Sequence, residues 1–333
     1  AALYDKKVDQ MQIKSLSESA TASSVGRSPE KRLITSIVYP QDRKTRLPIL
    51  SPNGKYLVKL FFNGCYRKVV VDDYLPCHST SGKLVCSTSI TVDGRLELWA
   101  SIIEKAYMKV HGGYNFQGSN SGQDLHALTG WIPEQIFLPK VNVSGSGSGD
   151  TLDHRQNPNR VWERLLGGVK HNLNLITVNT TQLTKEEETS TGLASCHAYA
   201  VLSVTNVTTS NSTSNSNSTS SDVSLRMLRV KNPWKNTPWK GRYSASDRRS
   251  WTSTMKNKLF GTTNENDITD MFNLMEQEGE FFIEYSDLLK YFGGLSEAGT
   301  GAGAGGGIFV NWNPDEVFTY KKSLHEYWPG NMA

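Results

Sequence analysis

The sequence predicts an α+β protein of two lobes, with a helical first lobe and an antiparallel, β-rich second lobe. Residues 96–110 carry apolar side chains at the 3.6-residue period of a helix, whereas the runs 173–179, 196–204, 225–231 and 281–285 are typical of strands. The length of 333 residues exceeds that of a usual single domain, and a hydrophobic content of 37% is enough for a large core. These observations favour two lobes over one.

The composition excludes several classes of function. The net charge of +4 is small for this length and the basic residues are scattered, so the chain lacks the basic patch of a nucleic-acid-binding protein. No apolar run reaches the roughly 18 residues of a membrane span. The cysteines have no C-x-x-C spacing and are too few for a disulfide framework, which favours a reducing, cytoplasmic location. The four cysteines are Cys65, Cys77, Cys86 and Cys196.

The clearest local signal in the first half is a β-hairpin. The strand-like runs 56–62 and 66–72 flank Asn63-Gly64, a pair that accepts the positive φ angles of a two-residue turn. Before it, the run 33–40 predicts a strand closed by a proline.

Two helices are predicted. The first, over 96–110, ends at Gly112-Gly113, and the second extends from Asn159 to about Lys170. The side chains expected to face the core are Leu98, Trp99, Ile102, Ile103, Ala106, Tyr107 and Val110 in the first helix, and Val161, Trp162, Leu165 and Leu166 in the second.

Two segments have almost no large apolar side chains. Residues 205–222 consist mainly of Ser, Thr and Asn, and residues 298–307 mainly of Gly and Ala, so both are expected to be flexible insertions at loop tips. We place the first lobe at 1–138 and the second at 139–320.

The candidate site combines His197, near the start of one predicted strand, with Asn232, at the end of another. Taken singly, a histidine on an apolar strand is more often a hydrogen-bonded core residue, and an asparagine before proline is a common strand end. Without the insertion, the two strands form an ordinary hairpin that brings both residues to one sheet edge. A neutral His197 can then take a thiol proton while the amide oxygen of Asn232 fixes its tautomer. Trp234 is expected to shield this hydrogen bond from water.

A nucleophile is harder to assign. Cys196 adjoins His197, but successive side chains of a strand point to opposite faces. Cys65 follows the hairpin turn, and Cys77 and Cys86 lie in predicted loops. Because none opens a helix, whose N-terminus would stabilise a thiolate, the sequence favours ordinary free thiols at all four positions.

Two other features leave alternatives open. Glu276, Glu278 and Glu280 surround Gly279 and could bind calcium or form a charged hairpin. Sequons such as Asn206-Val-Thr would be glycan acceptors in a secreted adhesin, the least favoured interpretation.

At the level of motifs, the chain from about Leu33 to Trp328 resembles the protease core of calpains, and most closely the fungal PalB type. So many motifs in one order make the resemblance specific. The segments that carry it are Leu33-Ile-Thr-Ser-Ile-Val-Tyr-Pro-Gln41, Lys68-Val-Val-Val-Asp-Asp-Tyr-Leu-Pro76, Glu97-Leu-Trp-Ala-Ser-Ile-Ile-Glu-Lys-Ala-Tyr-Met-Lys109, Asp124-Leu-His-Ala-Leu-Thr-Gly-Trp-Ile-Pro-Glu134, Cys196-His-Ala-Tyr-Ala-Val201, Lys231-Asn-Pro-Trp234, Trp239-Lys-Gly-Arg-Tyr243 and Asn311-Trp-Asn-Pro314.

The resemblance implies a papain-like, two-lobed cysteine endopeptidase. His197 then matches the general base, Asn232 the orienting amide and Trp234 the tryptophan beside the substrate cleft, and Gly118-Ser119 stands where the family has a cleft-lining glycine pair. The family's nucleophilic cysteine and oxyanion glutamine would precede residue 1. We therefore expect a core truncated before its nucleophile, which cannot cleave peptide bonds by itself.

The resemblance also bears on calcium. Glu97 matches a calcium ligand of the first lobe, whereas two acidic ligand positions of the second lobe hold Pro238 and Ala245. The remaining Glu278 and Glu280 are few for a cation that takes about six to eight oxygens. We therefore expect no required cofactor and no strong calcium activation.

By resemblance to PalB, the full protein would cleave a zinc-finger transcription factor in ambient-pH signalling. ESCRT-III components would recruit it from the cytoplasm to endosomes. Residues 321–333 resemble the start of a following C2-like β-sandwich. The alternative is a non-catalytic, calpain-like scaffold that binds these endosomal partners, and the residue at the nucleophile position upstream of residue 1 would separate the two.

Overall fold

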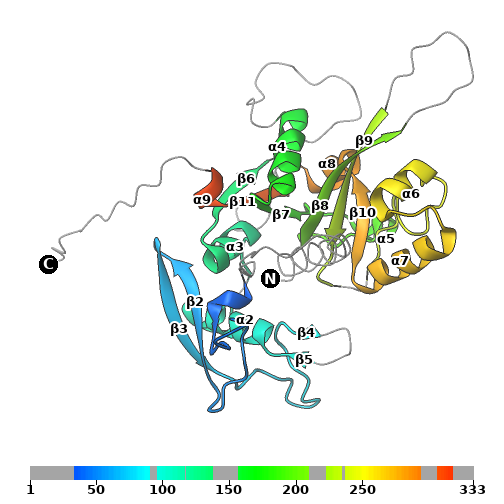
Figure 1. The fold of residues 1–333 in the computed structure, drawn as a ribbon. Coiled ribbons are helices and arrows are strands. Elements are labelled where there is room, and N and C mark those ends of the chain that lie inside the picture. Colours follow the sequence, from blue (N-terminus) through cyan, green and yellow to red (C-terminus); the bar gives the residue numbers. More distant parts are fainter. Residues whose placement is uncertain are drawn as a thin grey trace, which may run out of the picture. The chain divides into compact units, whose positions relative to one another are not determined.

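The computed structural model describes residues 34–90, 96–116, 118–137, 157–209, 223–234, 237–293 and 306–317. The chain divides into two compact units, which we describe separately (Figure 1). The first contains Ala1–Gln117, Leu125–Ile132 and Trp312–Ala333, and the second contains Gly118–Asp124 and Pro133–Asn311.

The first unit is built on a three-stranded antiparallel sheet, in the order β1-β2-β3, against which one long helix packs. A second ladder pairs β4 with β5. Its elements are the 3-10 helix η2 (Thr35–Ile37), β1 (Val38–Tyr39), β2 (Lys55–Phe62), β3 (Cys65–Asp72), β4 (Ser89–Ile90), β5 (Leu96–Glu97) and α2 (Trp99–Val110).

The predicted hairpin is confirmed. β2 and β3 pair antiparallel from Lys55↔Asp72 to Phe62↔Cys65, and Asn63 and Gly64 have φ angles of 50° and 73°. Two positive φ angles in succession match the right-handed twist of the strands, which is why Asn-Gly is favoured here.

The core of this unit lies between the sheet and α2. Alternate residues of β2 are buried and face the buried side chains of the helix, as expected for a sheet with one covered face. The packed residues are Tyr56, Val58 and Leu60 of β2, Val71 of β3, and Ile102, Ile103 and Ala106 of α2.

Two expectations for this unit need correction. The helix begins at Trp99 because Leu96–Glu97 pairs with β4, and Val110 is 41% exposed, outside the apolar face. The run 33–40 is mostly not a strand, since η2 leaves only Val38–Tyr39 to pair with β2. The side-chain amide of Gln41 donates to the carbonyls of Ser36 and Val38, which holds the chain in a turn.

The second unit is built on a six-stranded sheet in the order β10-β9-β8-β7-β11-β6, with helices on it. The ladders β10–β9, β9–β8 and β8–β7 are antiparallel. Its elements, with the helices α3 and α9 that lie at the division of the units, are α3 (Ser121–Thr129), β6 (Ile132–Ile136), α4 (Pro158–Lys170), β7 (Asn174–Asn179), α5 (Lys185–Thr191), β8 (Ala198–Thr209), β9 (Val223–Lys231), α6 (Ser253–Phe260), α7 (Glu265–Gln277), β10 (Glu280–Glu284), α8 (Tyr285–Phe292), β11 (Gly307–Trp312) and α9 (Pro314–Val317).

Both faces of this sheet are covered by helices. On one face the Trp162 ring of α4 donates to the side chain of Asn206, 2.8 Å away. On the other, Val207 packs with Met255 of α6 and Met275 of α7. Because neighbouring residues of a strand point to opposite faces, α4 lies on one side of β8, and α6 and α7 lie on the other (Figure 1).

The second half also differs from its predictions in detail. β8 begins at Ala198, two residues late, because Cys196 has a left-handed φ of 49°. Residues 205–209, predicted to be insertion, extend β8 and pair with 223–227. Residues 210–222 and 298–305 lie outside the described residues, and Gly307 already belongs to β11. The last predicted strand ends at Glu284, where α8 takes over.

No described helix is long and apolar enough to cross a membrane.

Candidate active site

The fold brings His197 and Asn232 to the same end of two neighbouring strands. His197 immediately precedes β8, and Asn232 immediately follows β9. In the antiparallel ladder, Ala200 lies opposite Lys231, so the start of β8 lies beside the end of β9. The backbone N–H of Asn232 donates to the carbonyl of Gly279, 2.8 Å away, which ties this end to the third strand, β10.

The two side chains are hydrogen-bonded. His197 Nε2 lies 3.1 Å from Asn232 Oδ1, and Asn232 is 1% exposed. The backbone N–H of Trp234 also donates to Asn232 Oδ1 (2.9 Å), and Asn232 Nδ2 donates to Thr237 Oγ1 (2.9 Å). A backbone N–H can only donate, so the amide atom that it meets is the oxygen. His197 Nε2 therefore carries the proton, and Nδ1 holds the lone pair.

The backbone of His197 is fixed by Thr180. The N–H of His197 donates to Thr180 Oγ1 (2.9 Å), and the N–H of Thr180 donates to the His197 carbonyl (3.0 Å). Beside it, the Cys196 N–H donates to the Thr181 carbonyl (3.2 Å). These bonds hold the imidazole in place although it precedes the regular strand.

Two aromatic rings enclose the imidazole. Trp234 lies over it with 4.0 Å between ring centroids and an interplanar angle of 31°, and Tyr199 meets it edge-on at 5.0 Å. Trp234 itself is 60% exposed, so its outer face meets solvent. The indole therefore covers one face of the imidazole beside the hydrogen bond with Asn232.

Burial lowers the pKa of His197 below its ordinary value, and the hydrogen bond to Asn232 opposes this in part. A neutral imidazole with its proton on Nε2 can accept a proton at Nδ1, which is the requirement for a general base. Among the described residues, Nδ1 has no hydrogen-bond partner.

NMR of this chain is expected to show this tautomer directly. Nitrogen-15 shifts of His197 should report a protonated Nε2 at pH 7, with titration below about 6.5. The pKa of His197 is lower in the folded chain than in the unfolded chain. The stabilisation that comes from keeping His197 neutral is therefore complete above about pH 6.5 and is lost as the pH falls through the folded-state pKa. Asn232→Asp should raise the pKa of His197, because a carboxylate favours the imidazolium. A protonated Nδ1 in the native chain would contradict the assignment.

Thr237 is a site residue that the sequence analysis missed. It satisfies the buried amide of Asn232, and the one available signal was a short polar side chain soon after Asn-Pro-Trp. Its loop is positioned by Gly192, which ends α5 with a φ of 74°. A Cβ atom there would lie 1.9 Å from the Pro238 carbonyl oxygen. Only glycine allows this approach.

The other predicted cleft residues are not bonded to this pair. Gly118 and Ser119 are exposed, Gly118 has a φ of 124°, and Ser119 Oγ donates to the carboxylate of Asp124. No hydrogen bond joins either residue to His197 or Trp234 in the described part of the chain.

All four cysteines are free thiols, and none is placed as a nucleophile. Cys196 is exposed in the turn before His197 and accepts a weak hydrogen bond from Ser195 Oγ at 3.8 Å. Cys65 starts β3, Cys77 bridges to Leu84, and Cys86 lies in a loop, so none begins a described helix.

The candidate calcium ligands already have protein partners. Glu278 Oε2 accepts from Lys231 Nζ at 2.9 Å, and the buried carboxylate of Glu280 accepts from Arg229. In the first unit, Glu97 Oε2 accepts from Ser89 Oγ (2.7 Å) and the Trp99 ring (3.1 Å). The described residues contain no group of three or more His, Cys, Asp or Glu side chains placed to hold a metal. An ammonium between two carboxylates does not suit a cation site, so no step here is assigned to calcium.

Comparison with known proteins identifies the family. The sequence model of the family described as calpain family cysteine protease matches residues 19–297 of this chain. The chain belongs to the calpain family of cysteine proteases. This confirms the predicted α+β class and the resemblance to PalB-type calpains.

Several curated proteins are similar to this chain across most of its length. Calpain-7 of Mus musculus is 36% identical over 315 residues, which cover 94% of this chain and 32% of that protein. The calpain-like protease palB/cpr-8 of Neurospora crassa is 34% identical over 299 residues, 89% of this chain and 25% of that protein. The calpain-like protease palB of Emericella nidulans is 31% identical over 309 residues, which cover 93% of this chain and 29% of that protein. The chain thus spans about a third or less of each of these relatives.

Proposed function

We propose that this chain is the core of a calpain-type cysteine endopeptidase, with His197 as general base and Asn232 as the residue that orients it. The observation that supports this most is the hydrogen bond between His197 Nε2 and Asn232 Oδ1. The backbone N–H of Trp234 orients the Asn232 amide so that its oxygen faces Nε2, which leaves the lone pair of the imidazole on Nδ1. The membership of the calpain family supplies the reaction class.

In the proposed reaction, the proton of a cysteine thiol passes to His197 Nδ1, and the sulfur attacks the carbonyl carbon of the scissile peptide bond. His197 then returns that proton to the leaving amine, which gives an acyl-enzyme. A water molecule, deprotonated by His197, hydrolyses the thioester and frees the thiol. Asn232 accepts from Nε2–H throughout, and so stabilises the imidazolium without changing its orientation.

The thiol is proposed to come from residues outside this sequence, since none of its four cysteines opens a helix or bonds to His197. The chain alone would then bind but not cleave. By the likeness to palB proteins, we propose that the full protein cleaves a zinc-finger transcription factor in ambient-pH signalling. ESCRT-III components would recruit it from the cytoplasm to endosomes.

The test is proteolysis of fluorescent casein by the full-length protein and by this chain. We expect cleavage by the full-length protein that iodoacetamide blocks, and none by the chain alone. Cleavage by the chain alone, blocked by alkylation, would disprove the assignment of the thiol. A full-length protein without activity would instead support the non-catalytic scaffold.

A further inference from the structure

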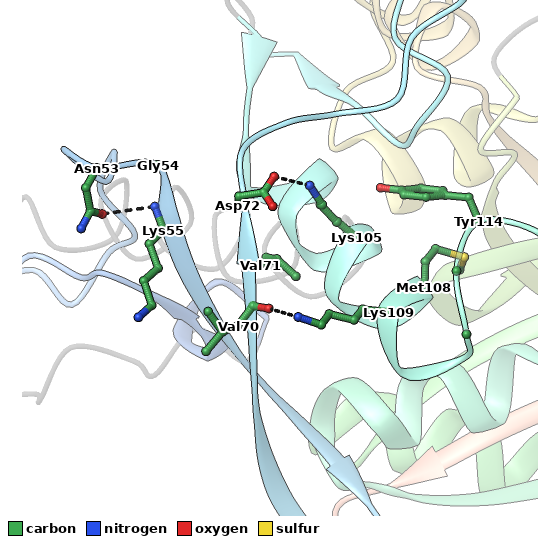
Figure 2. A pocket seen from close by; sticks show the side chains of 12 residues that line it. Asn53, Gly54, Lys55, Val70, Val71, Asp72, Lys105, Met108, Lys109 and Tyr114 are labelled. Carbon is green, nitrogen blue, oxygen red and sulfur yellow. Dashed lines mark hydrogen bonds and ion pairs between the residues drawn. The ribbon is translucent and has the colours of Figure 1, made fainter.

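We propose that the free edge of β3 is a docking site for an extended acidic peptide, which adds to the sheet as a fourth strand. The site belongs to the first unit, whereas His197 and Asn232 belong to the second, and the proposal does not depend on the proposed function. It is a groove of about 540 Å³ between the β2–β3 hairpin and the last turns of α2 (Figure 2).

The edge presents backbone groups that have no strand partner in the described sheet, although the Val70 carbonyl already accepts from Lys109 Nζ, a bond that a docked strand would replace. β3 has one strand neighbour in the described sheet, β2. Since Phe62 and Cys65 close a two-residue turn, the hydrogen-bonded pairs alternate from there, and the N–H and C=O groups of Lys68 and Val70 point away from β2. Among the described residues, no backbone group pairs with the N–H of either residue. An extended peptide is the ligand that satisfies such a row of groups.

Two lysines of α2 follow this edge in register. Lys105 Nζ donates to the Asp72 carboxylate, and Lys109 Nζ donates to the Val70 carbonyl at 2.8 Å (Figure 2). Lys105 Nζ also donates to the Tyr74 carbonyl. The helix therefore runs antiparallel to β3 along its free side. Four residues of helix advance about 6 Å and two residues of strand about 6.6–6.8 Å, so the lysines repeat with the period of one face of a strand.

The charge of the groove selects the peptide. Lys55, Lys105 and Lys109 line it, and Asp72 is the one acidic side chain among its described lining residues. A docked strand would point every second side chain toward α2, where Glu or Asp would meet the two helix lysines. On its other face, Val70 is 39% exposed and offers apolar contact for the alternate side chains. The predicted ligand thus has acidic residues at alternate positions, separated by β-branched ones.

The probe is a fluorescein-labelled peptide with Glu at every second position and Val or Thr between, titrated with this chain by fluorescence anisotropy. We expect saturable binding that weakens at high salt, and that is lost when alternate peptide nitrogens are methylated, because methylation removes the N–H donors of the added strand. A permuted peptide with the same composition but consecutive Glu residues should bind more weakly, because it places fewer carboxylates on one face.

Variants locate the site. Lys105→Gln with Lys109→Gln should weaken binding about fivefold to tenfold, as expected for two partly exposed charge pairs. The matched control replaces the exposed Lys44 and Lys83 of the same unit and should leave affinity unchanged. Val70→Pro removes an outward N–H without touching the β2–β3 ladder, and should abolish binding while circular dichroism stays native.

Several results would overturn the proposal. These are no saturable binding, equal binding of the methylated peptide, or equal effects of the two lysine pairs. Preferential binding of anionic lipid vesicles or of single-stranded DNA by the same lysines would also do so. If Val70→Pro does not fold, the methylated peptide still decides, since it leaves the protein unchanged.

Discussion

Glu280→Ala is expected to lower the free energy of unfolding by about 3 kcal/mol, because breaking this buried ion pair leaves the Arg229 guanidinium without its counter-charge, whereas Lys231 keeps its bond to Glu278. The Glu280 side chain is 2% exposed and lies opposite Lys231 in the β10–β9 ladder. Its carboxylate accepts from Arg229 Nε at 3.0 Å and lies 3.5 Å from Lys231 Nζ. Lys231 immediately precedes Asn232, so the loss should also loosen the end of β9 that carries the site.

Urea unfolding followed by circular dichroism checks this prediction. Glu276→Ala is the matched control: it removes an exposed carboxylate nearby in sequence and should change stability by less than about 0.5 kcal/mol. Equal midpoints for the two variants would show that the Glu280 carboxylate contributes little to stability.

His197→Ala is expected to lower kcat/KM of the full-length protease by roughly 10³-fold or more, a rise of about 4 kcal/mol in the activation barrier. The reason is that Nδ1 of His197 is the proposed acceptor of the thiol proton. Asn232→Ala should have a smaller effect. Without the amide oxygen the imidazole can adopt either tautomer, but His197 still supplies a nitrogen base.

His171→Ala serves as the control for these activity measurements. His171 is exposed at the end of α4 in the same unit, so its loss should leave kcat/KM unchanged. A similar loss for His171→Ala and His197→Ala would point to a general effect on folding. Full activity of His197→Ala would remove this residue from the mechanism.

Sequence patterns predicted the parts of the fold that depend on local periodicity. The Asn63-Gly64 turn was found because this pair accepts two positive φ angles, and the apolar face of α2 because a 3.6-residue repeat is specific to helices. The other described α-helices, α3, α5, α6, α7, α8 and α9, were missed. The apolar faces of α5, α6 and α7 are short, and α5 consists mainly of Glu, Thr and Ser, held by its capping box.

The candidate pair was predicted because each residue adjoins a strand end. The contacts that hold His197 and Asn232 in place could not be predicted from the sequence, because they come from loops that meet only in the folded chain. Thr237 reaches Asn232 because Gly192 lets the end of α5 approach Pro238. The left-handed turn at Cys196, which delays β8, is likewise invisible to a period-two pattern.

The most direct test of the central claim is the pH dependence of thiol alkylation in the full-length protein. If His197 accepts the proton of a catalytic thiol, one cysteine should react with iodoacetamide with an apparent pKa well below the usual 8.5 or so, and His197→Ala should return it to that value. Mass spectrometry should place the modified residue outside Cys65, Cys77, Cys86 and Cys196. An alkylation profile unchanged by His197→Ala, or a fast-reacting thiol among these four, would contradict the account.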